Sequence, residues 1–256
     1  MDIRILGAHN NESTSTSCVT FIIDGTLAVE AGGLTSRLSI QEQQKIDAVI
    51  LTHHHLDHIR DIPGIALNFC RLGASLDVYS TAVVGNVIRD HMLNTVVYPE
   101  FQNIPEKKPT LTFLEIEPYG LQWIDGHSIL PVPVNHAGEA VGYQICDKKG
   151  KTVFYTGDTG PDLAECWRHI SPQLLIIEVT FANASEALAR QTGHLTANLL
   201  EQELISFREM KGYLPEVLTI HMDAVLESTI REELAAVAEH LQIPITVARE
   251  DMRLQI

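Results

Sequence analysis

The stretch Thr52–His58, with the sequence THHHLDH, concentrates imidazoles and a carboxylate within one short segment. It follows an apolar run at 47–51 that predicts a buried strand, and it precedes residues 59–65, where a helix can begin. Neutral imidazole and carboxylate are typical ligands of zinc and similar divalent ions. Side chains 53 and 55 share one face of an extended backbone, whereas Asp57 and His58 lie past the turn. This spacing predicts two metal positions.

Charge and composition narrow the choice of partners. The formal net charge of −15 argues against a nucleic-acid polymer, because proteins that bind one usually present a basic face. No signal-peptide pattern opens the chain, and no stretch is long enough to span a bilayer. The four cysteines are scattered without a CxxC pair, as expected for free thiols in a reducing compartment. We therefore expect a cytoplasmic protein without membrane contact, and a homodimer is compatible with the sequence.

Hydrophobic periodicity predicts an α/β protein in which buried strands alternate with helices. Strands are expected at 3–6, 18–23, 26–30, 47–51, 77–79, 111–117, 120–124, 128–134, 141–146, 152–156, 174–178, 217–221 and 245–248. Helices are expected at 35–45, 81–93, 161–169, 194–211 and 223–241. This order favours two sheets sandwiched between helices. Since no repeat or linker interrupts the chain, residues 1–256 are predicted to form a single domain.

Residues 94–110 contain three Xaa-Pro steps, so regular structure is not expected there. Either a lid over the site or an ordinary surface loop fits this segment.

Three further candidate ligands share one placement. His136, Asp158 and His221 each lie at or just after the end of an apolar strand, and strand ends meet along one edge of a sheet. Taken singly, each residue has an ordinary structural explanation; Gly157–Gly160, for example, is a good turn sequence. Together with the histidine-rich turn, they predict one metal centre.

These motifs, in this order, resemble the metallo-β-lactamase fold superfamily along nearly the whole chain. The resemblance implies a four-layer αβ/βα sandwich and a site for two divalent metal ions. It implies that His53, His55 and His136 hold the first ion, that Asp57, His58 and His221 hold the second, and that Asp158 bridges them. His54 matches the variable position. Zinc is the first choice, and manganese and iron accept the same ligands.

One position departs from the family pattern. The family usually has an Asp in the first hairpin region, where this chain has Glu30 before Ala31-Gly32. Glu30 either orients the site from behind the ligands or is a surface carboxylate near a turn.

The implied chemistry is metal-dependent hydrolysis. Paired ions lower the pKa of a bridging water, orient the resulting hydroxide and stabilise a developing oxyanion. Asp57 and Asp158 offset part of the ionic charge, and Asp158 can also orient the attack. The residual positive charge would draw a small anionic substrate such as a phosphodiester.

A candidate general acid also favours a phosphodiester substrate. His194 is expected at the start of a helix, where the dipole disfavours a positive charge, so stability alone does not explain it. The segment from Glu178 to Gly193-His194-Leu195 resembles the phosphodiesterase branch of the superfamily, both class II cyclic-nucleotide phosphodiesterases and ribonuclease Z. The resemblance implies that His194 protonates or stabilises the leaving oxygen and that Glu178 tunes it. An exposed His194 and an ordinary strand-end Glu178 are the alternatives.

Several functions fit this set of residues. A phosphodiesterase acting on a small substrate such as a cyclic nucleotide is preferred, because the chain lacks the basic surface and arm that grip transfer RNA in ribonuclease Z. A lactone or ester hydrolase would use the same metals with less need of His194. A non-catalytic metal-bound sensor would keep the ligands without turnover.

Overall fold

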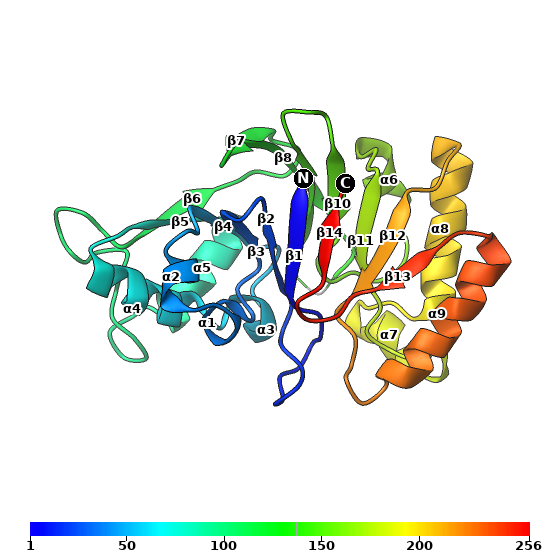
Figure 1. Ribbon diagram of the computed structural model, residues 1–256, viewed down its shortest axis with the longest axis horizontal. Coiled ribbons are helices and arrows are strands. Elements are labelled where there is room, and N and C mark those ends of the chain that lie inside the picture. The colour runs from blue at the N-terminus through cyan, green and yellow to red at the C-terminus, as the bar shows by residue number, and fades with distance from the viewer. Residues whose placement is uncertain (137) are drawn as a thin grey trace.

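The chain folds into four layers, with two β-sheets face to face and helices covering the outer side of each (Figure 1). The computed structural model describes residues 1–136 and 138–256. One sheet has the strand order β14-β1-β2-β3-β4-β5-β6 and the other β13-β12-β11-β10-β9-β8-β7. The predicted four-layer α/β sandwich is thus confirmed.

The first sheet comes mainly from the N-terminal half. Its strands are β1 (Asp2–Gly7), β2 (Thr20–Ile23), β3 (Leu27–Val29), β4 (Ala48–Ile50), β5 (Leu76–Ser80), β6 (Leu111–Glu115) and β14 (Arg253–Gln255). The helices of this half are α1 (Leu34–Arg37), α2 (Ile40–Gln43), α3 (Leu56–Ile59), α4 (Ile62–Leu72) and α5 (Ala82–His91). From β3 to β6 the strands are parallel, and helices join them.

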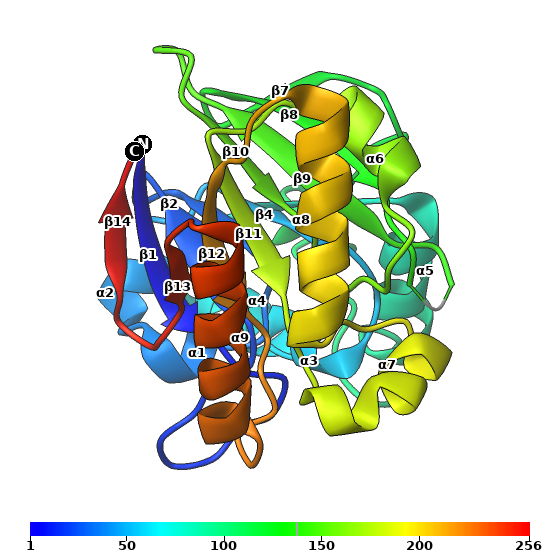
Figure 2. The same cartoon turned by 90° about the vertical axis from the view of Figure 1, so that its right-hand side faces the viewer.

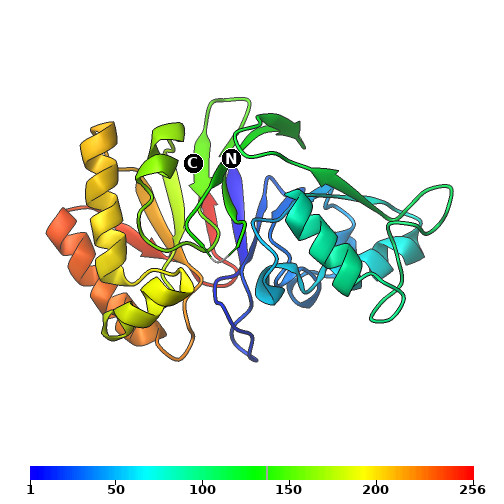
Figure 3. The same cartoon turned by 180° about the vertical axis from the view of Figure 1, so that it is seen from behind.

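The second sheet follows in the C-terminal half. Its strands are β7 (Gln122–Ile124), β8 (His127–Pro133), β9 (Val141–Cys146), β10 (Thr152–Tyr155), β11 (Leu174–Glu178), β12 (Glu216–Ile220) and β13 (Ile245–Val247). The helices here are α6 (Ala164–His169), the 3-10 turn η1 (Asn183–Ser185), α7 (Glu186–Thr192), α8 (Ala197–Lys211) and α9 (Glu227–Leu241). Figure 2 shows α8 and α9 side by side over this sheet, and Figure 3 shows the two helical layers from behind.

Alternation along the strands divides the apolar residues among three clusters. Ile3 and Ile5 of β1 join the cluster between the sheets, whereas Leu6 joins the cluster beneath α1–α5. This follows from the two-residue period of a strand. A third cluster packs the second sheet against α6, α8 and α9. The sheets also meet through Phe21 and Tyr155, whose rings stand edge to face with centroids 5.1 Å apart.

The two halves are joined at both ends of the strands. β14 pairs with β1, so the chain termini lie side by side (Figure 1). At the opposite end, the loop after β1 meets the loop after β12, where His221 donates its N–H to the carbonyl of Ala8 at 2.7 Å. This junction closes the end of the molecule that carries the candidate ligands.

Local interactions shift several predicted boundaries. The helix expected at 35–45 is divided into α1 and α2, because Ser39 and Glu42 form a capping box that starts a new helix. The helix expected from 161 begins at Ala164, since the N–H groups of Asp162 and Leu163 donate to the Glu203 carboxylate instead. Residues 94–110 contain neither helix nor strand, as predicted. In the part of the chain that the structure describes, no helix has the length and apolarity to cross a bilayer.

Replacing Phe21 by Ala should strongly destabilise the fold, because the side chain is fully buried between the sheets. We expect the free energy of unfolding to fall by about 3–5 kcal/mol, measured by urea denaturation. Leu121→Ala, at a side chain that is 64% exposed, serves as the control and should change it by less than about 0.5 kcal/mol. An equal loss in both variants would contradict the assignment of the core.

Candidate metal centre

The candidate ligands lie where strands of both sheets end. His53 and His55 follow β4, and Asp57 and His58 belong to α3, the single helical turn that comes next. From the second sheet, three residues follow their strands: His136 after β8, Asp158 after β10 and His221 directly after β12. The ends of β4, β8, β10 and β12 thus bring together residues separated by most of the chain.

These side chains form two groups, in each of which the ligand atoms all lie within 4.8 Å of one another. The groups are His53, His55, His136 and Asp158, and Asp57, His58, His221 and Asp158. Asp158 belongs to both. Its Oδ2 lies 3.6 Å from His53 Nε2 and 3.9 Å from His136 Nε2. Its Oδ1 lies 3.3 Å from His58 Nε2 and 3.4 Å from His221 Nε2, so each oxygen faces a different group.

The donor atoms fit bound metal ions. His53 Nε2, His58 Nε2 and Asp158 Oδ1 are buried without a hydrogen-bond partner. Buried polar atoms are normally satisfied, because leaving them unpaired is unfavourable. The imidazole and carboxylate donors match the preferences of zinc and neighbouring transition metals. These residues are therefore positioned to bind metal.

Electrostatics also favour a cation here. Burial lowers the pKa of His53 well below its usual value, which leaves the ring neutral and able to coordinate. Burial alone would raise the pKa of Asp158, but the surrounding histidines, His221 foremost, hold it well below its usual range. Burial lowers the pKa of His58, as it does that of His53, but the charges of Asp158 and Glu30 raise the pKa of His58 well above its usual value. A proton and a metal ion thus compete for the same nitrogen of His58.

The ring nitrogens that face away from the groups are held by neighbouring atoms. His136 Nδ1 lies 2.8 Å from the carbonyl of Gly193, and His221 Nδ1 lies 2.8 Å from Thr180 Oγ1. His53 Nδ1 lies 3.0 Å from Thr52 Oγ1. Such outer contacts fix ring orientation and tautomer and leave the other nitrogen free to coordinate.

Glu30 supports the centre from behind and is not a surface residue. Its side chain is fully buried, accepts a hydrogen bond of 2.5 Å from Thr52 Oγ1, and lies 3.3 Å from His58 Nδ1. Its backbone has φ = 65°. The longer carboxylate at this position thus reaches Thr52 and His58 together, consistent with the orienting role that the sequence left open.

The turn after β10 requires a glycine. Gly157 has φ = +61°, and a Cβ at this position would lie 2.8 Å from Thr52 Oγ1. The turn can therefore pass close to Thr52 only without a side chain, and this approach places Asp158 beside His53.

His194 and Glu178 form a hydrogen-bonded pair next to the candidate ligands. His194 Nδ1 lies 2.7 Å from Glu178 Oε1, and its ring stacks on that of His221 with centroids 5.7 Å apart. Burial lowers the pKa of His194, but the charge of Glu178 and this hydrogen bond outweigh it and raise the pKa to about 9. Glu178 is itself fully buried and accepts from the N–H groups of Thr159 and Thr180. The pair thus supplies a histidine that is protonated at neutral pH.

The expectation that His194 starts a helix is wrong. Thr196 caps α8 by accepting from the N–H of Leu199, and α8 begins at Ala197. His194 instead follows Gly193, the left-handed residue that ends α7. Glu178, rather than a helix dipole, therefore determines the charge of His194.

An open pocket exposes this centre to solvent. It is lined by Asn10, Cys18, His55, Leu56, Asp57, Arg60, Asp158, His194 and His221. Cys18, Leu56 and Arg60 were not predicted, although the position of Arg60 two residues after His58 was a signal for it. None of the residues that line this pocket comes from 94–110.

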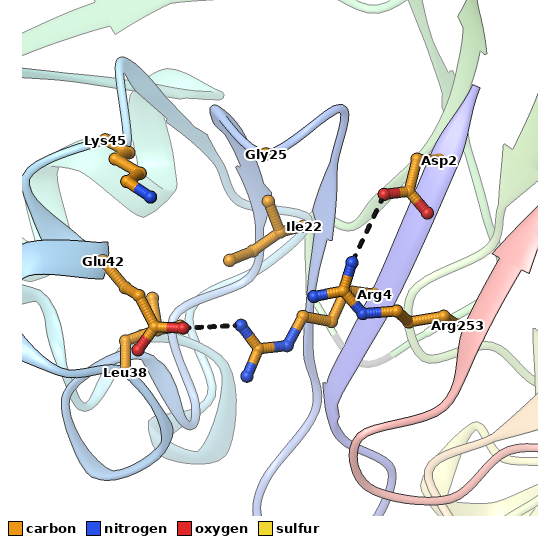
Figure 4. Close-up of a pocket in the computed structure, with 8 residues that line it drawn as sticks. All are labelled: Asp2, Arg4, Ile22, Gly25, Leu38, Glu42, Lys45 and Arg253. Atoms are coloured by element: carbon orange, nitrogen blue, oxygen red, sulfur yellow. Dashed lines mark hydrogen bonds and ion pairs between the residues drawn. The ribbon is translucent and has the colours of Figure 1, made fainter.

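A second pocket, between β1 and α2, has a different character (Figure 4). Its charged groups neutralise one another: Arg4 donates to Glu42 at 2.9 Å, and Arg253 lies 3.6 Å from Asp2. This pocket contains no histidine, its acids are paired with arginines, and none of the candidate metal-binding groups found among the described residues lies in it.

His9 lies in the 8–17 loop and anchors it. Its ring is almost fully buried, with Nδ1 2.8 Å from Glu250 Oε1 and Nε2 3.2 Å from Glu227 Oε2. Those two carboxylates belong to the C-terminal part of the chain. His9 therefore fastens the 8–17 loop to α9 and the segment before β14. His54 belongs to neither ligand group.

Comparison with known proteins identifies the family. The family model described as "Beta-lactamase superfamily domain" matches residues 20–222, which include all the candidate ligands. The chain belongs to the β-lactamase superfamily. This assignment agrees with the resemblance found in the sequence, and the superfamily is one of metal-dependent hydrolases.

Relatives within the superfamily carry related names. A 3',5'-cyclic-nucleotide phosphodiesterase of Aliivibrio fischeri is 25% identical over 189 residues, which cover 66% of this chain and 56% of that protein. A metal-dependent hydrolase of Myxococcus xanthus is 28% identical over 47% of this chain and 40% of its own length. The matches thus span about half the length of these two relatives. A ribonuclease Z of Methanococcus maripaludis is 24% identical and covers 83% of both chains.

Solved structures show the same fold. Unliganded yeast PDE1 superposes with a TM-score of 0.85 at 17% identity, covering 100% of this chain and 99% of that one. The short form of human tRNase Z gives a TM-score of 0.71 at 17% identity, with the same coverage. These structures confirm the four-layer architecture.

The His9 contacts predict a pH-dependent contribution to stability. Burial lowers the pKa of His9, but Glu250 and Glu227 outweigh it and raise the pKa above its unfolded value. The ionic stabilisation is therefore fully present below the unfolded pKa of about 6.5, while both glutamates are ionised, and is lost as pH rises through the folded pKa. In urea denaturation, the loss of stability in His9→Gln should be larger at about pH 6 than at about pH 9.5. His91→Gln, at an exposed site, is the control, and a pH-independent loss in His9→Gln would contradict the ionic role.

Proposed function

We propose that this protein is a metal-dependent hydrolase that cleaves a small phosphodiester, such as a cyclic nucleotide. The observation that carries the proposal is the arrangement around Asp158, whose two oxygens face two separate ligand groups, with the protonated His194 stacked against one of them. The similarity to a cyclic-nucleotide phosphodiesterase supports the same choice of substrate.

Two divalent ions, zinc being the first choice, would be held by the two groups, with Asp158 shared between them. When bound, such ions supply Lewis acidity and a water of lowered pKa next to the scissile bond. Asp57 would contribute to one position, and hydrogen bonds with His221 and His58 keep its pKa well below the usual range in spite of burial, so it remains ionised.

His194 would serve the leaving group. Because Nδ1 is engaged by Glu178, Nε2 is the atom that can give a proton to a departing alkoxide. An alkoxide is a poor leaving group, and positioned proton donors are most effective for such groups. Glu178 would keep His194 charged and oriented between turnovers.

The substrate is proposed to be small and organic. Leu56 lines the pocket yet is 68% exposed, which offers an apolar contact to a substituent of the phosphodiester. The net charge of −15 opposes the long basic surface on which a transfer RNA would rest. The ribonuclease Z relative, which covers 83% of both chains, makes RNA processing the second candidate.

Metal analysis tests the two-ion centre. Purified protein reconstituted with zinc should contain about two zinc ions per chain, measured by inductively coupled plasma mass spectrometry, as expected for two complete ligand groups. His58→Ala should lower the content to about one equivalent, because it removes one ligand of the second group. His54→Ala removes the neighbouring imidazole that belongs to neither group and should leave the content unchanged. A single equivalent in the unaltered protein would contradict the shared role of Asp158.

Replacing His194 by Ala tests the reaction. For a cyclic nucleotide, kcat should fall by about 10²–10⁴-fold, as for loss of a general acid. For bis-p-nitrophenyl phosphate the loss should be below about tenfold, because p-nitrophenolate leaves without a proton. His169→Ala, in an exposed histidine of α6, is the control.

Other outcomes would assign other functions. Equal losses on both substrates would make His194 structural. Hydrolysis confined to lactones or esters would identify the protein as an ester hydrolase. Processing of transfer RNA would favour a ribonuclease Z-like function. Two bound metals without turnover on any of these substrates would indicate a sensor.

A further inference from the structure

Arg60 occupies a position in the pocket that the proposed chemistry does not use. It ends α3, where its N–H donates to the carbonyl of Leu56 at 2.8 Å, and it lines the same pocket as Asp57, Asp158 and His194. Its side chain is 33% exposed, so the guanidinium is neither buried in the core nor free in solvent. The ligand-bearing turn therefore places Arg60 in the wall of the pocket.

Among the described residues that line this pocket, Arg60 is the one arginine, and no lysine joins it. Asp57 and Asp158 line the same space, and the whole chain carries a net charge of −15. An anion approaching such a surface meets repulsion except where a fixed cation compensates it. Apart from His194 and any bound metal, Arg60 is the group that can provide this compensation.

In the free protein, the guanidinium is engaged by Glu12. Arg60 Nη1 forms an ion pair with Glu12 Oε2, and Glu12 belongs to the 8–17 loop. Two other contacts are weaker: Arg60 Nη1 donates to Cys18 Sγ at 3.8 Å, and Arg60 Nε lies 3.6 Å from Asp61 Oδ1. Asp61 is already committed, since its Oδ2 accepts from the N–H of Thr35 at 2.7 Å. Glu12 is therefore the principal counter-ion of Arg60.

This ion pair is suited to exchange. The side chains of Arg60 and Glu12 are both about a quarter to a third exposed, and ion pairs of this kind contribute little to stability. A guanidinium binds carboxylate and phosphate oxygens with the same forked geometry. A substrate anion that is also held elsewhere in the pocket can thus replace the Glu12 carboxylate at little loss.

We infer that Arg60 binds an anionic group of the substrate and that Glu12 occupies this place until the substrate arrives. Arg60 is then a specificity-determining residue that selects charged over neutral substrates, and Glu12 is a built-in competitor. Arg60 comes from the first-sheet half and His194 from the second, so the substrate would contact one residue from each side of the ligand groups. The inference rests on the proposed function in requiring an anionic substrate.

Kinetics on a charged and a neutral substrate test this selection. We expect Arg60→Gln to raise KM for bis-p-nitrophenyl phosphate by about tenfold or more, the effect of losing a charge-assisted contact. Glu12→Gln should lower that KM by about threefold, because the competitor is removed. KM for neutral p-nitrophenyl acetate should change by less than about twofold in both variants.

The exposed pair Arg168 and Glu165 on α6 provides matched controls, since Arg168 Nη1 lies 2.7 Å from Glu165 Oε2 outside the pocket. Arg168→Gln and Glu165→Gln should leave both KM values unchanged. If Arg60→Gln raises KM equally for the charged and the neutral substrate, or leaves both unchanged, the inference is overturned. A Glu12→Gln variant whose KM for the phosphodiester rises would overturn the competitor role.

A binding measurement separates this inference from the proposed function. Inorganic phosphate is titrated into the zinc-loaded protein by calorimetry, which requires no turnover. Arg60→Gln should raise Kd by about tenfold and Glu12→Gln should lower it by about threefold. This result without phosphodiester cleavage would support Arg60 and reject the proposed reaction. Cleavage of phosphodiesters with an unchanged Kd in Arg60→Gln would reject Arg60 alone.

Discussion

The structure depends on a fully buried carboxylate whose charge is compensated from two directions. Asp158 lies at the end of β10 between two groups of imidazoles, and one oxygen faces each group. Burying an isolated carboxylate is strongly unfavourable, so the neighbouring histidines and the cations they can hold are needed to keep it ionised. The Nε2 atoms of His53 and His58 are buried without a hydrogen-bond partner, so these nitrogens also need a partner such as a cation.

Around this centre, three of the candidate ligands are oriented by atoms outside the ligand groups. Thr52 joins Glu30 to His53, Thr180 contacts His221, and the carbonyl of Gly193 contacts His136. The backbone has adapted to these contacts: Glu30 and His221 both have positive φ, and Gly157 passes Thr52 at a distance that excludes a Cβ. Unfavourable backbone conformations of this kind persist only where surrounding contacts hold them. These outer contacts therefore hold the backbone of the site in its conformation.

Charge is distributed unevenly between the site and the rest of the protein. The chain is strongly acidic, yet the pocket contains Arg60 and a His194 whose pKa is raised to about 9 by Glu178 in spite of burial. Each of these cations is paired with a glutamate, Arg60 with Glu12 and His194 with Glu178. The two pairs differ in burial, since Glu178 is fully buried and Glu12 is partly exposed. Only the Glu12 pair is therefore free to exchange its carboxylate for another anion.

The sequence by itself determined the elements whose signals are local. Apolar runs predicted the buried strands, and the spacing around His53, His55 and Asp57 indicated two metal positions, because strand and turn geometry depends on neighbouring residues. The capping box at Ser39 and the N-cap Thr196 of α8 were also local signals, although the predicted helix bounds did not follow them. Strand β14 and the contact of His9 with Glu250 had no local signal, since their partners lie more than two hundred residues away.

Only the tertiary structure decided how distant groups combine. Whether Asp158 presents one oxygen to each group, whether Glu178 reaches His194, and whether Glu12 meets Arg60 all depend on how the two sheets pack. Residue types and spacing specify which chemical groups are available along the chain. Ångström-scale distances between groups on different strands arise only when the core fixes the relative position of the sheets, and those distances determine the charge and chemistry of the site.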